Sequence, residues 1–174
     1  MGETLQVIRS RRSCRSYKPE FIEEDKLGKI IEAGTYAASG MGKQAPIIIA
    51  VTDKKLRDEI AAMNAKVMGQ KEDFDPFYGA PEILIVLADK SVATHVYDGS
   101  LVLGNMMLAA EDLGVASCWI HRAKEEFESE RGKEILKSLG ITGDYEGIGH
   151  LAIGYAAAPA RKAAPRKEGY VYRV

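Results

Sequence analysis

The sequence has few cysteines, no long hydrophobic run and no excess of charge of either sign. Its two cysteines, Cys14 and Cys118, are too few for a disulfide framework, so we expect reduced thiols. No apolar run reaches the roughly 18 residues of a membrane-spanning helix, and the N-terminus lacks the basic-then-apolar order of a signal peptide. These absences predict a soluble, cytoplasmic protein without a membrane partner.

Charge is balanced over the whole chain but not along it. The formal net charge of −1 argues against a surface that attracts nucleic acid. Residues 9–18 nevertheless carry only basic charges, and acidic residues follow immediately, so an anionic ligand is expected beside this stretch. The length of 174 residues, with 46% apolar and 28% charged residues, predicts that residues 1–174 form one globular domain.

Several common catalytic motifs are missing. The string Gly40–Ala45 fits G-x-G-x-x-A, but a dinucleotide fingerprint needs a strand before it and a helix after it, and here the order is reversed. Gln44 stands where a Walker loop has Ser or Thr, and no serine lies in a G-x-S-x-G elbow. The three histidines are scattered, so no metal site is expected.

Hydrophobic periodicity predicts helices and strands in alternation. Helical spacing favours a short first helix near residues 5–8 and further helices over 23–37, 53–66, 96–113 and 125–139. Asp53 is the expected N-cap of the helix over 53–66. Short apolar runs favour strands at 46–52, 83–88, 115–120 and 147–154. Residues 156–167 lack periodicity and are expected to form an extended arm, followed by a terminal strand over 170–174. The pattern indicates an α/β or α+β fold.

Three segments are candidates for a binding site. Arg11, Arg12, Ser13 and Arg15 concentrate donors suited to a phosphate, although a solvated basic surface explains the same run. The small residues between Ala38 and Gln44 allow close approach of a planar ligand, or they simply connect a helix to a strand.

The third segment, residues 117–122, is the end of a predicted strand, which is a natural ligand position in sheet proteins. A Trp such as Trp119 is more often a core residue than a cofactor platform, and a lone His such as His121 is more often a satisfied surface or core residue. Cys118 has no basic neighbour that would make it a nucleophile.

Taken together, these motifs resemble those of the FMN-dependent nitroreductase family. Arg11 to Pro19 matches R-R-S-x-R-x-Y-x-P, and Ala37 to Pro46 is similar to the family's A-P-S-x-x-N-x-Q-P-W loop. Gly114 to Ile120 matches G-x-x-x-C-W-I, and Gly149 to Tyr155 matches G-x-x-x-I-G-Y. Pro165-Arg166-Lys167 resembles the family's C-terminal basic pair.

This resemblance implies an α+β homodimer with a central mixed sheet packed by helices, a C-terminal arm exchanged with the partner subunit, and two FMN sites at the interface. Within each site it implies FMN phosphate ligands, residues that approach the ring from the partner chain, a residue at the polar edge of the ring, and residues on its other side. The implied phosphate ligands are Arg11, Arg12, Ser13, Arg15, Arg166 and Lys167, and the residues that approach the ring from the partner chain are Ala38, Ser39, Gly40, Gly42 and Gln44. The residue implied at the polar edge of the ring is Asn64, and those on its other side are Ile120, His121 and Arg122.

The family's activity implies hydride transfer from NAD(P)H through flavin N5 to a nitroaromatic, quinone or similar acceptor by a ping-pong mechanism. No protein general acid is expected to be obligatory; His121 and Arg122 are candidates for assistance. The alternatives are reductive dehalogenation or flavin-consuming oxidation, for which residues 69–81 would be the lid, and a non-catalytic flavin-binding protein. A nucleic-acid-binding module is disfavoured because no aromatic residues interleave with the arginines.

Overall fold

The computed structural model describes residues 2–71 and 73–174, so Glu72 of the candidate lid lies outside the described residues. The elements are α1 (Glu3–Ser10), α2 (Glu24–Thr35), the 3-10 turn η1 (Gly40–Gly42), β1 (Pro46–Val51), α3 (Lys54–Val67), β2 (Glu82–Asp89), α4 (His95–Asp112), β3 (Ala116–Ile120), α5 (Ala123–Glu128), α6 (Glu130–Ser138) and β4 (Tyr145–Gly154). Each predicted strand before the C-terminal arm, and each predicted helix except that over 125–139, is present to within a few residues at its ends.

The four strands form one sheet in the order β1-β2-β4-β3. All three strand pairs are antiparallel, so the expectation of a mixed sheet is wrong for the described residues of a single chain. Parallel pairing is confined there to an isolated bridge between Ser13 and Ser117, outside the named strands. The central strands β2 and β4 are buried on both faces, which explains the apolar run of β2 and that of residues 151–153 in β4.

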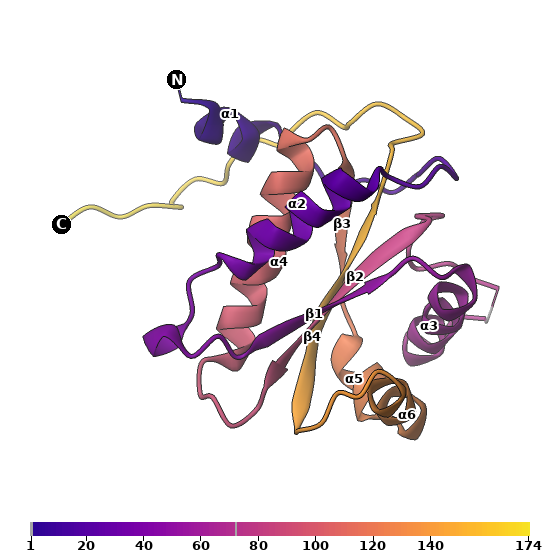
Figure 1. Cartoon of the computed structure of the whole chain (residues 1–174). Helices are drawn as coiled ribbons and strands as arrows, with labels where there is room; N and C mark the ends of the chain where they lie inside the picture. The colour runs from indigo at the N-terminus through magenta and orange to yellow at the C-terminus, as the bar shows by residue number, and fades with distance from the viewer. Residues whose placement is uncertain (1, 72) are drawn as a thin grey trace.

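Helices cover both faces of this sheet (Figure 1). On one face, α2 and α4 bury Ile30, Leu103 and Met106 against β2 and β4. On the other, α3, α5 and α6 close a second apolar cluster around Phe77 and Ile85. The result is the α+β arrangement, with the sheet between two separate cores.

Local side-chain chemistry explains the helix boundaries. Asp53 caps α3 as predicted, because its carboxylate accepts a hydrogen bond from Leu56 N at 2.8 Å. The single helix predicted over 125–139 is instead two helices, because Ser129 is extended and its Oγ accepts from Gly132 N at 3.1 Å. Gly132 is required there, since a Cβ would clash with the carbonyl of Glu126.

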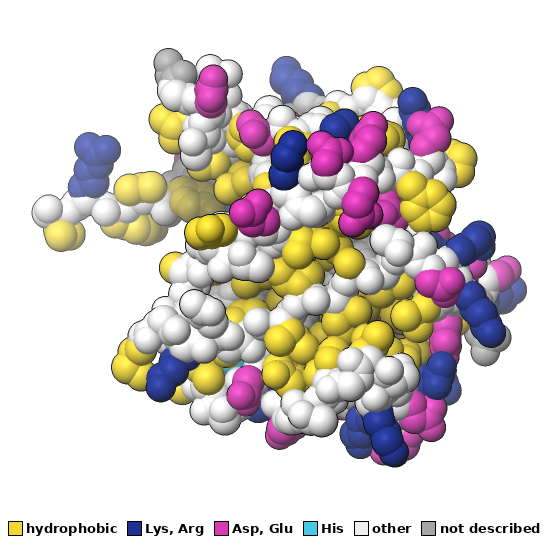
Figure 2. Space-filling model, in the orientation of Figure 1, with side chains coloured by type: hydrophobic (Ala, Val, Ile, Leu, Met, Phe, Trp, Pro, Cys, Tyr) yellow, Lys and Arg dark blue, Asp and Glu magenta, His cyan; other side chains and the backbone are white. Residues whose placement is uncertain are grey.

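The C-terminal segment runs away from the body of the molecule, to the left in Figures 1 and 2. Residues 170–174 form no strand, which corrects the prediction of a terminal strand. Their apolar side chains are uncovered, with Tyr172 85% exposed. Among the described residues, no helix combines the length and apolarity needed to cross a bilayer.

Candidate functional site

The arginine segment lies along β3. Ser13 bridges Ser117 in parallel, and Cys14 N donates to Ser117 O at 2.9 Å. The buried Tyr17 hydroxyl donates to the Ala152 carbonyl at 3.1 Å. These contacts fix the backbone from which the basic side chains project, beside the beginning of β3.

Among the residues that the structure describes, no ion pair neutralises the guanidinium groups of this segment. The arginine ion pairs of the described residues belong to Arg57 of α3 and Arg131 of α6. Arg12 Nη1 donates to the carbonyls of Arg9 and Arg11 at 2.8 and 2.7 Å. Arg12 Nε and Arg11 Nη1 are buried and have no hydrogen-bond partner among the described residues. Buried donors without acceptors are costly, so this surface favours an anion.

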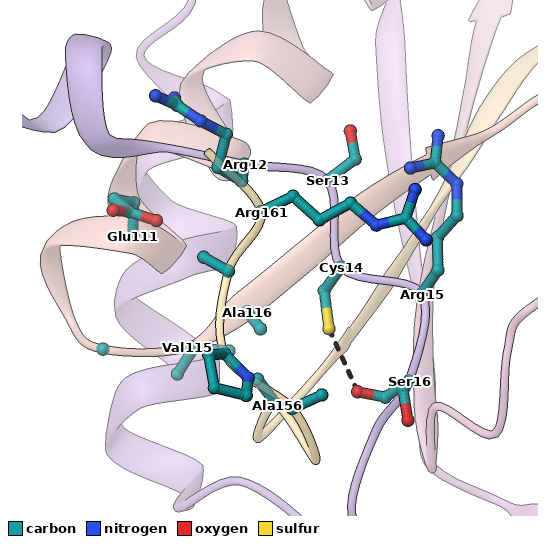
Figure 3. Close-up of a pocket in the computed structure, with 14 residues that line it drawn as sticks. Arg12, Ser13, Cys14, Arg15, Ser16, Glu111, Val115, Ala116, Ala156 and Arg161 are labelled. Carbon is teal, nitrogen blue, oxygen red and sulfur yellow. Dashed lines mark hydrogen bonds between the residues drawn. The ribbon is translucent and has the colours of Figure 1, made fainter. Parts of the chain in front are cut away.

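The C-terminal arm adds further positive charge to the same place. Arg161 and Arg15 extend toward the same space beside Ser13, whereas Arg12 points away from it (Figure 3). Arg161 lines both a cavity of about 330 Å³ and a neighbouring one of about 720 Å³. Sequence reasoning missed Arg161, and its signal was a basic residue in the unperiodic arm.

The predicted basic pair of the arm is divided. Arg166 lines the larger cavity, and its Nη2 donates to Ala164 O at 2.7 Å. Lys167 lines neither cavity, and its Nζ lies 5.4 Å from the centre of the Tyr170 ring.

The two thiols do not form a nucleophilic site. Cys14 Sγ donates to Ser16 O at 3.1 Å (Figure 3). Cys118 is buried in β3, and this burial raises the pKa of its thiol, although the nearby Arg15 opposes the shift. A thiol with a raised pKa remains protonated near neutral pH and is a poor nucleophile.

The loop from Ala38 to Gln44 is held by a buried acid. Asp98 of α4 accepts from Gly40 N at 3.0 Å and from Thr94 Oγ1 at 3.0 Å. A side chain at Gly40 would clash with Thr94, so glycine is needed for this contact. Ala38, Ser39 and Gln44 line a cavity of about 420 Å³. Asp98 was not identified from the sequence; its signal was an acid near the start of a long apolar helix.

Within one chain, loop 38–44 lies away from the arginine segment. The loop directly precedes β1, whereas the arginine segment lies beside β3, and β1 and β3 are the two edges of the sheet. Three strand spacings separate these edges, about 14 Å. The register also places the start of β1 and the start of β3 at opposite ends of the sheet. The two cavities therefore share no lining residue.

The turn after β3 contains the remaining candidates. Ile120 is buried, His121 is exposed, and Arg122 is half-buried with a left-handed φ of 82°. Asn64, expected at the polar edge of the ring, lies fully buried beneath this turn instead. Its Nδ2 donates to His121 O at 2.8 Å, and its Oδ1 accepts from Arg122 Nε at 3.4 Å. Its amide therefore contacts the turn rather than an open surface.

Comparison with known proteins identifies the family. The model of the nitroreductase family matches residues 8–155. The chain belongs to this family. A nitroreductase with bound FMN from Bacteroides fragilis NCTC 9343 is 31% identical, with 100% of both chains covered and a TM-score of 0.89. A nitroreductase with bound FMN from Desulfitobacterium hafniense DCB-2 is 30% identical, with 100% of both chains covered and a TM-score of 0.88.

The curated relatives include an FMN reductase [NAD(P)H] from Bacillus subtilis (strain 168), which is 27% identical over 93% of this chain and 69% of its own length. The nitroreductase fold is thus present over the whole chain, including its four-stranded sheet packed by helices. In this nitroreductase, the arginine segment and the turn lie at the two ends of β3. Ala116 to Ile120 separates them by about 13 Å at the usual rise per residue of a strand.

Proposed function

We propose that this nitroreductase is an FMN-dependent oxidoreductase that accepts hydride from NAD(P)H and passes it to a nitroaromatic, quinone or similar acceptor. The similar structures from B. fragilis and D. hafniense hold FMN, and the B. subtilis relative is an NAD(P)H-dependent FMN reductase. The observation that carries the proposal is the unpartnered, buried Arg11 Nη1 and Arg12 Nε beside Arg15 and Arg161.

The arginine segment fits a phosphate monoester. Arg11 and Arg15 would supply charge-assisted hydrogen bonds, and the Ser13 hydroxyl would add a neutral donor. Arg12 would join them only after its side chain turns toward Ser13. Arg161 and Arg166 would close the site from the arm, and Lys167 would join them only after the arm moves. The cavity at the start of β3 and the turn at its end are separated by a length comparable with that of an extended FMN.

FMN, when bound, supplies the hydride-carrying centre of the reaction. The chain's own groups bind and orient. Ile120, His121 and Arg122 would line one side of the ring, and the Arg122 guanidinium would favour negative charge there. Ala38, Ser39, Gly40, Gly42 and Gln44 would approach the ring from a second subunit, where the small residues permit close contact.

A homodimer is part of this proposal, because the two halves of the site are separated within one chain. Exposed apolar residues support it: Tyr97 and Leu101 of α4 are uncovered, as are Val171 and Tyr172 of the arm. Figure 2 shows a further apolar area at the centre of one face, around β1. Exchange of the arm would bury such side chains, at about 1.5–3 kcal/mol for each large one fully buried. Residues 1–174 would act as one cytoplasmic domain.

The test is spectroscopic. Purified protein should be yellow with an FMN spectrum, and the colour should bleach under argon on addition of NADH or NADPH. Reoxidation should then follow addition of a nitroaromatic or a quinone. Flavin that stays oxidised with both nucleotides would overturn the oxidoreductase proposal and favour a non-catalytic flavin protein. Reduced flavin that ignores both acceptors but transfers electrons to a halogenated aromatic would favour dehalogenation.

A further inference from the structure

A buried polar cluster lies beneath the turn formed by His121 and Arg122. Its members are Asn64 of α3, Glu126 of α5 and His150 of β4, which are 0%, 1% and 0% exposed. Asn64 Nδ2 donates to Glu126 Oε1, and Glu126 Oε2 lies 2.8 Å from His150 Nε2 without hydrogen-bond alignment. The His150 ring packs against Phe77, with the ring centres 5.3 Å apart.

The cluster is joined to the turn by hydrogen bonds of the Asn64 side chain. Asn64 Nδ2 donates to His121 O at 2.8 Å, and Asn64 Oδ1 accepts from Arg122 Nε at 3.4 Å. Glu126 orients the amide, because a carboxylate only accepts hydrogen bonds and so attracts the Asn64 NH₂ group. With that group fixed, the other amide atom, Oδ1, must face Arg122.

The turn needs external support because its backbone is strained. Arg122 has a φ of 82°, a left-handed value that non-glycine residues rarely adopt unless their surroundings impose it. Arg122 is also the N-cap residue of α5, yet its side chain makes no capping hydrogen bond. The support therefore comes from below, through Asn64.

We propose that Asn64, Glu126 and His150 are positioning residues that hold the His121–Arg122 turn in its left-handed conformation, and thereby set how Arg122 and the adjoining backbone face the flavin ring. The inference rests on the proposed function for its last step. Its first step, control of the turn, concerns the protein alone and is tested separately. The Glu126 side chain contacts the turn through Asn64, and the Glu126 backbone N–H also donates to Arg122 O at 3.2 Å. His150 lies beside Glu126 and pairs in the sheet with Ile120, directly before the turn.

The decisive variant is Asn64→Leu, which keeps similar volume and removes both contacts with the turn. Glu82→Gln is the matched control, because Glu82 is a 2%-exposed polar residue whose carboxylate accepts from Ile22 N, far from the turn. The first measurement needs no flavin. Trypsin cleavage after Arg122 should be at least about tenfold faster in Asn64→Leu than in the wild type or in Glu82→Gln, since a released turn fits a protease more readily.

The second measurement is the ratio of the affinities for reduced and oxidised FMN. Asn64→Leu should lower this ratio at least about tenfold, which corresponds to about 30 mV in the two-electron midpoint potential, because Arg122 is no longer held against the anionic reduced ring. Glu126→Gln keeps the shape and an acceptor for Asn64, so its ratio should remain within about threefold of the wild type. Glu82→Gln should change only thermal stability.

The outcomes separate the two proposals. Faster cleavage with an unchanged affinity ratio would refute the link to the ring, and unchanged cleavage would refute control of the turn. If the wild type binds no FMN, the proposed function fails, while the cleavage result still decides the role of the cluster. If Asn64→Leu does not fold, Asn64→Ser replaces it, with an expected change of at least about threefold in both readouts, because one hydroxyl proton cannot serve both acceptors.

Discussion

Arg15 offers the sharpest test of the phosphate assignment. Among the described residues no carboxylate pairs with it, since the arginine ion pairs belong to Arg57 and Arg131. Its guanidinium carbon lies 6.0 Å from the centre of the Tyr78 ring, a contact that gives it orientation without neutralising its charge. Replacement of Arg15 by Ala therefore breaks no ion pair within the protein, and the loss should fall on the ligand.

The magnitude follows from the chemistry of the contact. A hydrogen bond to a charged group contributes about 1.5–3 kcal/mol, and about 1.4 kcal/mol is tenfold in affinity. Arg15→Ala should therefore raise the Kd for FMN about ten- to a hundredfold. The lower end is expected because Arg15 is exposed and Arg161 shares its cavity. Riboflavin has no phosphate, so it should bind the wild type weakly, and its Kd should change less than about twofold in Arg15→Ala.

The assay is a titration of both flavins against both proteins by flavin fluorescence. Arg131→Ala is the matched control, because Arg131 is also a surface arginine but pairs with Glu59 of α3 and Glu134 of α6 and lines neither cavity beside the arginine segment. Its FMN affinity should equal that of the wild type. Equal binding of riboflavin and FMN by the wild type, or equal weakening of the two by Arg15→Ala, would refute the phosphate assignment.

Three further predictions follow from other parts of the molecule. Deletion of residues 156–174 should abolish both FMN binding, measured by absorbance, and dimer formation, measured by sedimentation. A truncated protein that remains a dimer and retains FMN would contradict arm exchange. Asp98→Leu removes the acceptor of Gly40 N and should weaken FMN binding several-fold with a release of loop 38–44, whereas Asp98→Asn, which keeps an acceptor, should be milder. Burial raises the pKa of Glu82, so the folded state binds its proton more tightly than the unfolded state, and this contribution to stability is lost as pH rises through the raised pKa. The Tm of Glu82→Gln minus the Tm of the wild type should therefore be larger at pH 7 than at about pH 4. The same difference at both pH values would count against the raised pKa.

The helices and strands could be predicted from the sequence because their signals are local. Asp53 caps its helix, and the apolar runs of β2 and β4 become the buried central strands. The break at Ser129 was missed because helical periodicity continues across it, and only the capping contact with Gly132 reveals two helices. Among the named strands of the described residues no pair is parallel, since β1–β2, β2–β4 and β4–β3 all pair in opposite directions.

The candidate site was predictable only where its residues are neighbours in sequence. Arg11 to Arg15 formed such a group. The contributions of Arg161 and Asp98 depend on long-range placement, since Arg161 comes from the arm and Asp98 meets a loop 58 residues earlier. The buried position of Asn64 beneath the turn could not be predicted, because a polar residue on a helix does not reveal whether it faces ligand or core until the packing of α3 is known.

Under the proposed dimeric site, the sheet order predicts that cofactor binding depends on protein concentration. The arginine segment is attached to the β3 edge and loop 38–44 to the β1 edge, so a flavin that contacts both must lie between two copies. A ligand that binds only the dimer stabilises it by mass action. Apparent FMN affinity should therefore fall as the protein is diluted through the dimer dissociation range, and FMN should shift that range to lower concentration. Arg15→Ala should reduce this FMN-induced shift of the dissociation range, since it lowers the affinity for FMN and leaves the exposed apolar side chains of α4 unchanged. An FMN affinity that is the same at all protein concentrations, with monomers present, would show that one chain completes the site by itself.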